Sequence, residues 1–140
     1  MVPGFNNNAH FRIEYGLNSI FTQNYSNYKA VIVDDCSSDG SQEAYRRYFA
    51  FHRIDRAKYV YVENSAHVTA LPNIYFNAMA HCGRDSIVML VDGDDELIGR
   101  NTLQLFNWGY QTKKVGVLYT NHFGYDQRKD LFLGYTFAYS

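Results

Sequence analysis

The chain has 140 residues and a formal net charge of −1 at pH 7, with 46% hydrophobic and 19% charged residues. This composition suits one packed domain and excludes intrinsic disorder, and the near-neutral charge gives no support for a nucleic-acid-binding surface. No apolar run approaches the ~20 residues of a membrane span, and no signal peptide is present. The two cysteines, Cys36 and Cys82, are too far apart for a zinc motif. We therefore expect a cytoplasmic protein with free thiols.

The first half of the chain predicts helices and strands in alternation. A helix is expected over residues 13–21, capped by the asparagines at 6–8, with an inward face of Ile13, Leu17, Ile20 and Phe21. Residues 28–33 are mostly apolar and β-branched, and they predict a strand that is buried on both faces. A second helix follows Gly40, with an apolar face of Ala44, Tyr45, Tyr48 and Phe49. Residues 58–62 predict the next strand.

The second half continues this alternation. A third helix is expected to begin near Thr69, with an inward stripe of Leu71, Ile74, Tyr75, Ala78 and Met79. The apolar run at residues 87–91 predicts a strand, and residues 115–120 predict another. Between them, residues 100–110 predict a helix whose inward residues are Leu103, Phe106 and Tyr110. The aromatic tail from residue 124 gives no clear element.

Strands that alternate with helices of this length predict an α/β fold with a mostly parallel sheet. No strand is expected before the first helix, although such a domain normally has one there, and the total number of strands is small. We therefore expect residues 1–140 to form a single, partial domain that is truncated at both ends.

Two carboxylate clusters follow predicted strands, namely Asp34-Asp35 and Asp92-Gly93-Asp94-Asp95. Ligands of parallel sheets bind outside the carboxyl ends of the strands, so both clusters point to one site. Asp92 and Asp94 project to the same side of an extended segment. Carboxylates of this kind suit Mg²⁺ or Mn²⁺, which commonly use one or two of them together with substrate phosphates. The sequence thus indicates a metal–diphosphate site, and the alternative is that these aspartates only cap the following turn.

The first cluster has a structural alternative of its own. Asp39 and Gln42 have the spacing of a capping box for the helix that follows, so Asp39 can act as a cap or as a ligand. Asp34 and Asp35 lack such a structural role, and a carboxylate can accept hydrogen bonds from a nucleobase N–H or from ribose hydroxyls.

These motifs resemble those of family 2 glycosyltransferases. Pro3-Gly4-Phe5-Asn6 is similar to the segment that closes the first strand of the family, and residues 17–25 resemble its first helix. Residues 34–41, Asp-Asp-Cys-Ser-Ser-Asp-Gly-Ser, resemble its Asp-Asp-x-Ser-x-Asp-Gly-Ser/Thr signature, and residues 92–95 resemble its Asp-x-Asp-Asp (DXD) metal motif. The resemblance covers roughly residues 3–123, with the motifs in the family's order.

The resemblance implies a GT-A fold, which is a Rossmann-like sheet with flanking helices, and a nucleotide-sugar donor, with a UDP-sugar favoured. Pro3 and Asp35 are implied to lie near the base, with Asp35 pairing with its N–H. Asp34 and Asp39 are implied to support this pocket. The family often carries a basic residue where this chain has Pro72.

The resemblance also implies a metal site and a reaction. Asp94 is the implied principal ligand of Mn²⁺ or Mg²⁺, and Asp92 is implied to approach the ribose or the metal. The reaction is transfer of a sugar to an unknown hydroxyl acceptor. The family's catalytic base lies in its second half, beyond Ser140, so no catalytic residue is assigned.

Three other classes compete with this interpretation. A binding-only or degenerate domain of the same fold fits every motif equally well. A signalling receiver domain accounts for the strand ending in Asp34-Asp35, but its strand should open the chain and its phosphoacceptor should be a lone Asp. A phosphatase of the haloacid dehalogenase type uses Asp-x-Asp, but it expects Thr or Val where Glu96 stands.

Overall fold

A three-stranded parallel sheet organises the fold, in a computed structural model that describes residues 1–8, 12–113, 115–120, 122–126 and 131–136. Its strands, in the order β1-β2-β3, are β1 (Val2–Gly4), β2 (Ala30–Asp34) and β3 (Tyr59–Glu63). Val2 pairs with Ile32 across the first ladder, and Ala30 pairs with Tyr59 across the second. All residues of β2 are buried, which confirms the predicted strand.

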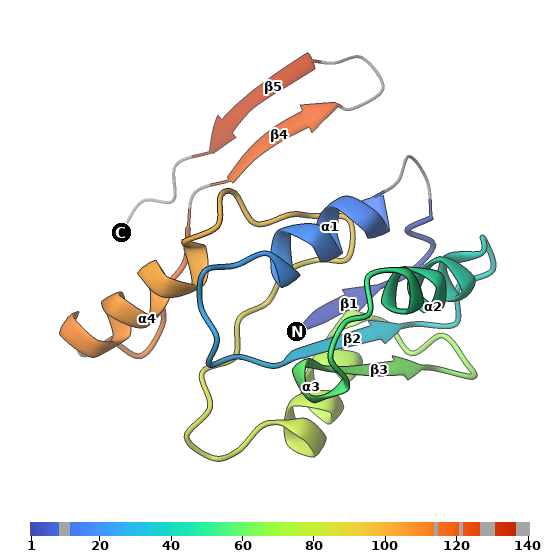
Figure 1. The fold of residues 1–140 in the computed structure, drawn as a ribbon, viewed down its shortest axis with the longest axis horizontal. Coiled ribbons are helices and arrows are strands. Elements are labelled where there is room, and N and C mark those ends of the chain that lie inside the picture. The colour runs from blue at the N-terminus through green and yellow to red at the C-terminus, as the bar shows by residue number, and fades with distance from the viewer. Residues whose placement is uncertain (9–11, 114, 121, 127–130, 137–140) are drawn as a thin grey trace.

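Helices cover both faces of this sheet (Figure 1). Their bounds are α1 (Arg12–Phe21), α2 (Ser41–Phe51), α3 (Ala70–His81) and α4 (Thr102–Lys113), and a short 3-10 helix spans Arg56–Lys58. Helices α1 and α2 lie on one face of the sheet, and α3 lies against β1 and β2 on the other. Side chains alternate along a strand, so one face of β2 meets α1 and α2 and the other meets α3.

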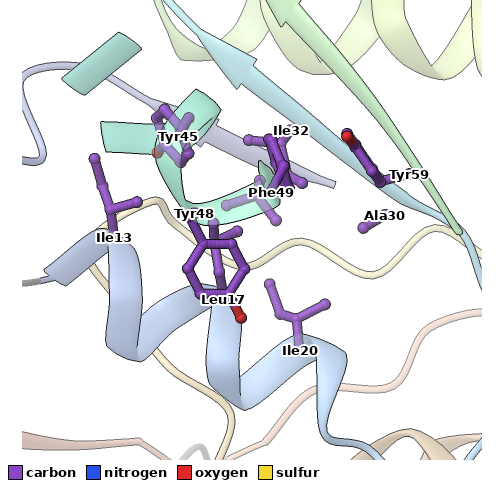
Figure 2. Packing of buried hydrophobic residues seen from close by; sticks show 10 residues of the cluster. Ile13, Leu17, Ile20, Ala30, Ile32, Tyr45, Tyr48, Phe49 and Tyr59 are labelled. Carbon is purple, nitrogen blue, oxygen red and sulfur yellow. The ribbon is translucent and has the colours of Figure 1, made fainter. Parts of the chain in front are cut away.

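The hydrophobic core lies between α1, α2 and the sheet (Figure 2). The predicted faces of the first two helices supply it, since Ile13, Leu17 and Ile20 of α1 and Tyr45, Tyr48 and Phe49 of α2 are all buried against Ala30 and Ile32 of β2. Full burial of one such side chain contributes about 1.5–3 kcal/mol to folding. This packing fixes the two helices relative to the carboxyl end of β2.

The expectation that no strand precedes the first helix is wrong, because β1 pairs with β2 along its whole length. The strand is only three residues long and contains Pro3 and Gly4, two residue types that strands generally lack. Its composition therefore gives no strand signal in the sequence. The strand is held in the sheet by its pairing with β2.

Residues 87–91 do not form the predicted regular strand, but they run alongside β1. Val91 N donates to Met1 O at 3.0 Å, and Gly93 N donates to Pro3 O at 2.9 Å. Met1 N donates back to Met89 O at 2.7 Å, but Pro3 has no N–H to donate, which leaves the ladder incomplete. Three side chains of this segment are exposed: Ile87, Val88 and Leu90.

The predicted inward stripe of α3 is also wrong. The buried residues of α3 are Asn73 and Asn77, whereas Leu71 and Met79 are 76% and 71% exposed. Asn73 Oδ1 accepts from Asn64 Nδ2 at 2.7 Å at the end of the sheet. Asn77 Nδ2 donates to Asn73 O at 2.9 Å, so hydrogen bonds accompany the polar side that α3 turns inward.

The last part of the chain confirms the fourth helix and corrects the fourth strand. Helix α4 half-buries Leu103, Phe106 and Tyr110, as predicted. Residues 115–120 form no strand. Instead β4 (His122–Asp126) and β5 (Leu131–Thr136) make an antiparallel hairpin, which Figure 1 shows apart from the parallel sheet. A short apolar run does not reveal by itself whether it forms a strand. In this part of the chain the strands are the two segments that pair with each other, β4 and β5.

None of the helices described in the structure is long and apolar enough to cross a membrane.

Candidate functional site

The two carboxylate clusters meet at one edge of the sheet, as predicted. The end of β1 holds both of them, because Gly4 O accepts from Asp35 N and Pro3 O accepts from Gly93 N, each at 2.9 Å. Asp92 and Asp94 flank Gly93 on one side of β1, and Asp35 lies on the other. The carboxyl end of a parallel sheet is where such folds bind ligands.

Asp34 shapes the turn between β2 and α2. Its side chain is fully buried, and Oδ2 accepts from Ser37 N at 3.0 Å and from Gln42 Nε2 at 2.9 Å. Oδ1 is buried without a hydrogen-bond partner among the described residues. Because Gln42 binds Asp34, it does not complete the predicted capping box with Asp39, and that prediction is wrong. Asp34 thus holds the turn that joins β2 to α2, and its predicted role in a donor pocket stays a prediction.

Asp39 joins the start of α2 to the segment after β1. Its Oδ1 accepts from the N–H of Ser41, the first residue of α2, at 3.0 Å, and its Oδ2 accepts from Asn8 N at 2.9 Å. These bonds lower the pKa of Asp39 although burial opposes the change. The asparagines at 6–8 were expected to cap α1, but they bind the 37–41 turn instead: Asn6 Oδ1 accepts from Ser38 N at 3.0 Å. Asp39 therefore has a structural role here, and its predicted ligand role stays a prediction.

Asp35 is the most strongly hydrogen-bonded carboxylate of the site. Oδ1 accepts from Asn64 Nδ2 at 2.7 Å and Val68 N at 3.0 Å, and Oδ2 accepts from Thr69 N at 2.8 Å. His67 Nδ1 lies 2.8 Å from the same Oδ2. Burial alone would raise the pKa of Asp35, but the hydrogen bonds outweigh it and lower the pKa to about 2. Asp35 therefore stays ionised and ties the loop after β3 to β2.

This depressed pKa predicts a loss of stability in acid. Because the folded pKa is below the unfolded value of 3.8, the ionised carboxylate stabilises the fold above pH 3.8, and the contribution is lost as the pH falls towards 2. The shift corresponds to about 2 kcal/mol of unfolding free energy. Urea denaturation at pH values from 5 to 2.5 should show this loss in the wild type but not in Asp35→Asn. Equal losses in both proteins would contradict the assignment.

The loop that carries Asp92 and Asp94 is fixed between β1 and α1. Leu97 N donates to Ser19 Oγ of α1 at 2.9 Å, and Asp95 N donates to Asp92 O at 2.9 Å within the turn. Asp92 and Asp94 are both exposed. Asp94 Oδ2 pairs with Arg12 Nη1 at 3.4 Å, which keeps one carboxylate beside a cationic side chain at the start of α1.

The residues at this loop fit a divalent cation that also binds substrate. Within the described part of the chain, no three His, Cys, Asp or Glu side chains gather as a ready metal cage. Two exposed carboxylates remain, and Mg²⁺ or Mn²⁺ commonly binds one or two carboxylates and completes its shell with phosphate and water. The donor set therefore suits an ion that arrives with a diphosphate.

Several residues of the site were not found from sequence. Arg12, Asn64 and His67 lie far from the acidic motifs in the chain, and only the fold brings them beside Asp94 and Asp35. The one sequence signal for a site role of Asn64 and His67 was their position just after a predicted strand.

A hollow of about 290 Å³ lies away from these residues, between α1 and α2, with Tyr48, Phe51 and His52 among its lining residues.

Comparison with known proteins places the chain among glycosyltransferases. The sequence profile of glycosyl transferase family 2 matches residues 2–136. The structure of "Mannosyltransferase PcManGT from Pyrobaculum calidifontis in complex with GDP-Man and Mn2+" is similar, with a TM-score of 0.66 and 24% identity over 82% of this chain and 33% of that protein. No match was found among curated protein sequences.

Two structures of TarS from S. aureus are also similar. One has a TM-score of 0.59 and 24% identity over 79% of this chain and 18% of that one. The other, TarS 1–349 in complex with UDP-GlcNAc, has a TM-score of 0.60 and 22% identity over 79% of this chain and 30% of that one. At these identities the likeness shows the fold, which confirms the predicted Rossmann-like GT-A class. The chain spans about a third or less of the length of these proteins.

Proposed function

Because the chain belongs to glycosyl transferase family 2, we propose that it forms the donor-binding part of an enzyme. This enzyme transfers a sugar from a nucleotide-diphosphate-sugar donor to a hydroxyl acceptor. The observation that carries this proposal is the meeting of the two acidic clusters at the end of β1, where Gly4 and Pro3 accept from Asp35 and Gly93. In this proposal, the cluster at Asp34 and Asp35 binds the nucleoside and the cluster at residues 92–95 binds the diphosphate.

Asp94 and Asp92 are the proposed ligands of Mn²⁺ or Mg²⁺. When bound, the ion neutralises the charge that develops on the leaving diphosphate. Asp94 now contacts Arg12. If Asp94 held the ion, the Arg12 guanidinium would be available to donate to phosphate oxygens. The similar mannosyltransferase structure contains Mn²⁺, which supports a divalent ion in this kind of fold.

The nucleoside pocket is proposed to use Pro3, Asp34, Asp35 and Asp39. Pro3 in β1 and Asp34 at the end of β2 are buried, while Asp35 and Asp39 hold the loops that follow. We favour a UDP-sugar, on the resemblance of the motifs. The similar solved structures contain GDP-Man in one case and UDP-GlcNAc in another, so both bases belong in the test.

Donor binding without transfer is the second candidate. Pro72 favours it, because Pro72 lies in the first turn of α3 where the family often has a basic residue, and a proline offers no donor to a phosphate. Release of free nucleotide diphosphate from a nucleotide sugar, with and without simple hydroxyl acceptors, separates the two candidates. Turnover supports a transferase, and tight binding without any turnover supports the binding-only alternative.

Calorimetric titration of the folded chain with UDP and GDP, each with and without Mn²⁺, tests the proposed site. We expect one diphosphate to bind at least about tenfold more tightly when Mn²⁺ is present, because two exposed carboxylates alone repel a diphosphate. A well-folded chain that binds neither nucleotide under any of these conditions would contradict the proposal.

A further inference from the structure

Positive charge gathers around the end of α2 and the starts of β2 and β3, away from the acidic site. Lys29 directly precedes β2 and Lys58 directly precedes β3, two strands that pair in parallel from their first residues. The segment between α2 and β3 adds Arg53 and Arg56, and α2 itself adds Arg47; all three side chains are exposed. The acidic clusters follow the carboxyl ends of the strands, so the sheet separates the two kinds of charge along its length.

The cations of this region are not neutralised by carboxylates. None of them forms an ion pair with a carboxylate of the described residues. Lys58 Nζ donates to Ser26 O at 2.7 Å and lies 5.6 Å from the centre of the Tyr28 ring. The Arg56 guanidinium lies 5.4 Å from the centre of the Tyr59 ring. These contacts position the two side chains and leave their charges in place.

The region is positive although the whole chain carries a formal charge of −1. Residues 47–58 contain four arginine or lysine residues and one acidic residue, Asp55. Asp55 caps the 3-10 helix, where its Oδ1 accepts from Ala57 N at 2.9 Å. One further carboxylate, Glu14 of α1, lines the hollow between α1 and α2 together with Arg47. Cations remain in excess here, so a negatively charged surface is attracted to this region and not to the chain as a whole.

An exposed aromatic ring lies among these cations. Phe51 is the last residue of α2 and is 79% exposed, more than any other large hydrophobic side chain that the structure describes. Arg47 lies one helical turn before it, on the same side of the helix. The region therefore presents one free apolar side chain next to several cations.

This combination fits a lipid bilayer better than a nucleic acid. Anionic lipids attract lysine and arginine, and the layer just below the headgroups accepts an apolar side chain. Single-stranded nucleic acids bind largely through open aromatic rings on which the bases stack. Here Lys58 lies over the ring of Tyr28, and Arg56 lies over the ring of Tyr59, which is itself buried. These two rings are therefore not open to a base.

We propose that this region, which we call the α2–β3 surface, binds the anionic face of a lipid bilayer. The surface consists of Lys29, Arg47, Phe51, Arg53, Arg56 and Lys58. Its cations contact the lipid headgroups, and Phe51 enters the interfacial layer. The carboxylates of residues 92–95 then lie at the other end of the strands, away from the negative charge that would repel them. The proposal does not depend on nucleotide binding or on sugar transfer.

Flotation of the chain with lipid vesicles tests the α2–β3 surface. Vesicles of phosphatidylcholine alone are compared with vesicles of equal parts phosphatidylcholine and phosphatidylserine. We expect the chain to bind the mixed vesicles at least about tenfold more tightly, and this preference to weaken as salt is added, because exposed charges are screened. Equal binding to both kinds of vesicle, or no binding by a folded chain, overturns the proposal.

Two neighbouring arginines of α2 provide a matched pair of variants. Arg47 has no described carboxylate partner, whereas Arg46 forms ion pairs with Glu63 at the end of β3 and with Glu43. Each of Arg47→Gln and Arg46→Gln removes one positive charge. We expect Arg47→Gln to bind the mixed vesicles about fivefold more weakly and Arg46→Gln to stay within about twofold of the wild type. Phe51→Ala should also lose about fivefold, with an unchanged melting temperature.

Equal losses in Arg46→Gln and Arg47→Gln overturn the proposal, because binding would then follow net charge and not this surface. If Arg47→Gln fails to fold, Arg53→Gln combined with Arg56→Gln replaces it: a loss of about 25-fold supports the surface, and an unchanged affinity overturns it. A single-stranded RNA is the competing ligand. Tighter binding of RNA than of the mixed vesicles, lost in the same variants, would identify a nucleic-acid surface and overturn the bilayer proposal. These measurements use no nucleotide sugar, so their failure leaves the proposed function untouched.

Discussion

Replacement of Asp94 by alanine is expected to abolish metal-dependent nucleotide binding. Asp94 is exposed on the loop that β1 holds through Gly93, and Arg12 is its described partner. The loss of one ligand from a site with only two carboxylates removes several kcal/mol of metal–diphosphate binding, or about 100-fold or more in affinity. Calorimetry with UDP or GDP and Mn²⁺ measures this loss.

Asp85→Ala is the matched control for Asp94→Ala. Asp85 is also exposed, but it precedes the 87–93 segment and so lies at the opposite end of the sheet from Asp94. We expect this variant to bind nucleotide as the wild type does. Equal binding by the wild type and Asp94→Ala would remove Asp94 from the metal site, whereas equal losses in both variants would indicate a nonspecific effect of charge.

Replacement of Gly93 by alanine is expected to destabilise the fold and to displace the acidic loop. A Cβ at this position would lie 2.8 Å from Gly4 Cα and 2.9 Å from Pro3 O, and backbone atoms of a paired strand cannot move aside. Overpacking of this kind costs about 1–3 kcal/mol of unfolding free energy. Because Gly93 joins Asp92 and Asp94 to β1, nucleotide affinity should fall as well.

Gly116→Ala provides the control, because a Cβ there meets no atom within 4 Å. Urea denaturation should give this variant nearly the stability of the wild type, and the two alanine variants should differ by more than about 1 kcal/mol. Similar stabilities for Gly93→Ala and the wild type would mean that the acidic loop does not rest on β1 as described.

The parts of the fold that were predictable are those whose packing follows one periodicity. Helices α1 and α2 bury an apolar face at helical spacing, and β2 is apolar throughout, so the core between them could be read from sequence. The carboxylates of the site were predictable because they follow apolar segments at the ligand-binding edge of a parallel sheet. The helices, the strand and the acidic clusters are each encoded by residues that are close together in the sequence.

The remaining features depend on contacts that no local pattern encodes. Helix α3 faces inward with Asn73, whose Oδ1 accepts from Asn64 beside Asp35, and it leaves Leu71 and Met79 exposed. The 87–91 segment lacks a full ladder because Pro3, more than eighty positions away, has no N–H to give. His67 reaches Asp35 only through the loop conformation at Thr69, which a sequence does not reveal.

Paramagnetic broadening by Mn²⁺ tests the central claim, a metal–nucleotide site at the carboxyl end of the sheet, most directly. Mn²⁺ broadens the NMR signals of nearby backbone amides, and the chain of 16.2 kDa is small enough for each amide to be followed. With UDP or GDP present, the account predicts selective loss of signals from residues 4–8, 35–39 and 92–95, and no such loss in Asp94→Ala. Broadening centred elsewhere, or none at all in a folded chain with nucleotide present, would contradict the account.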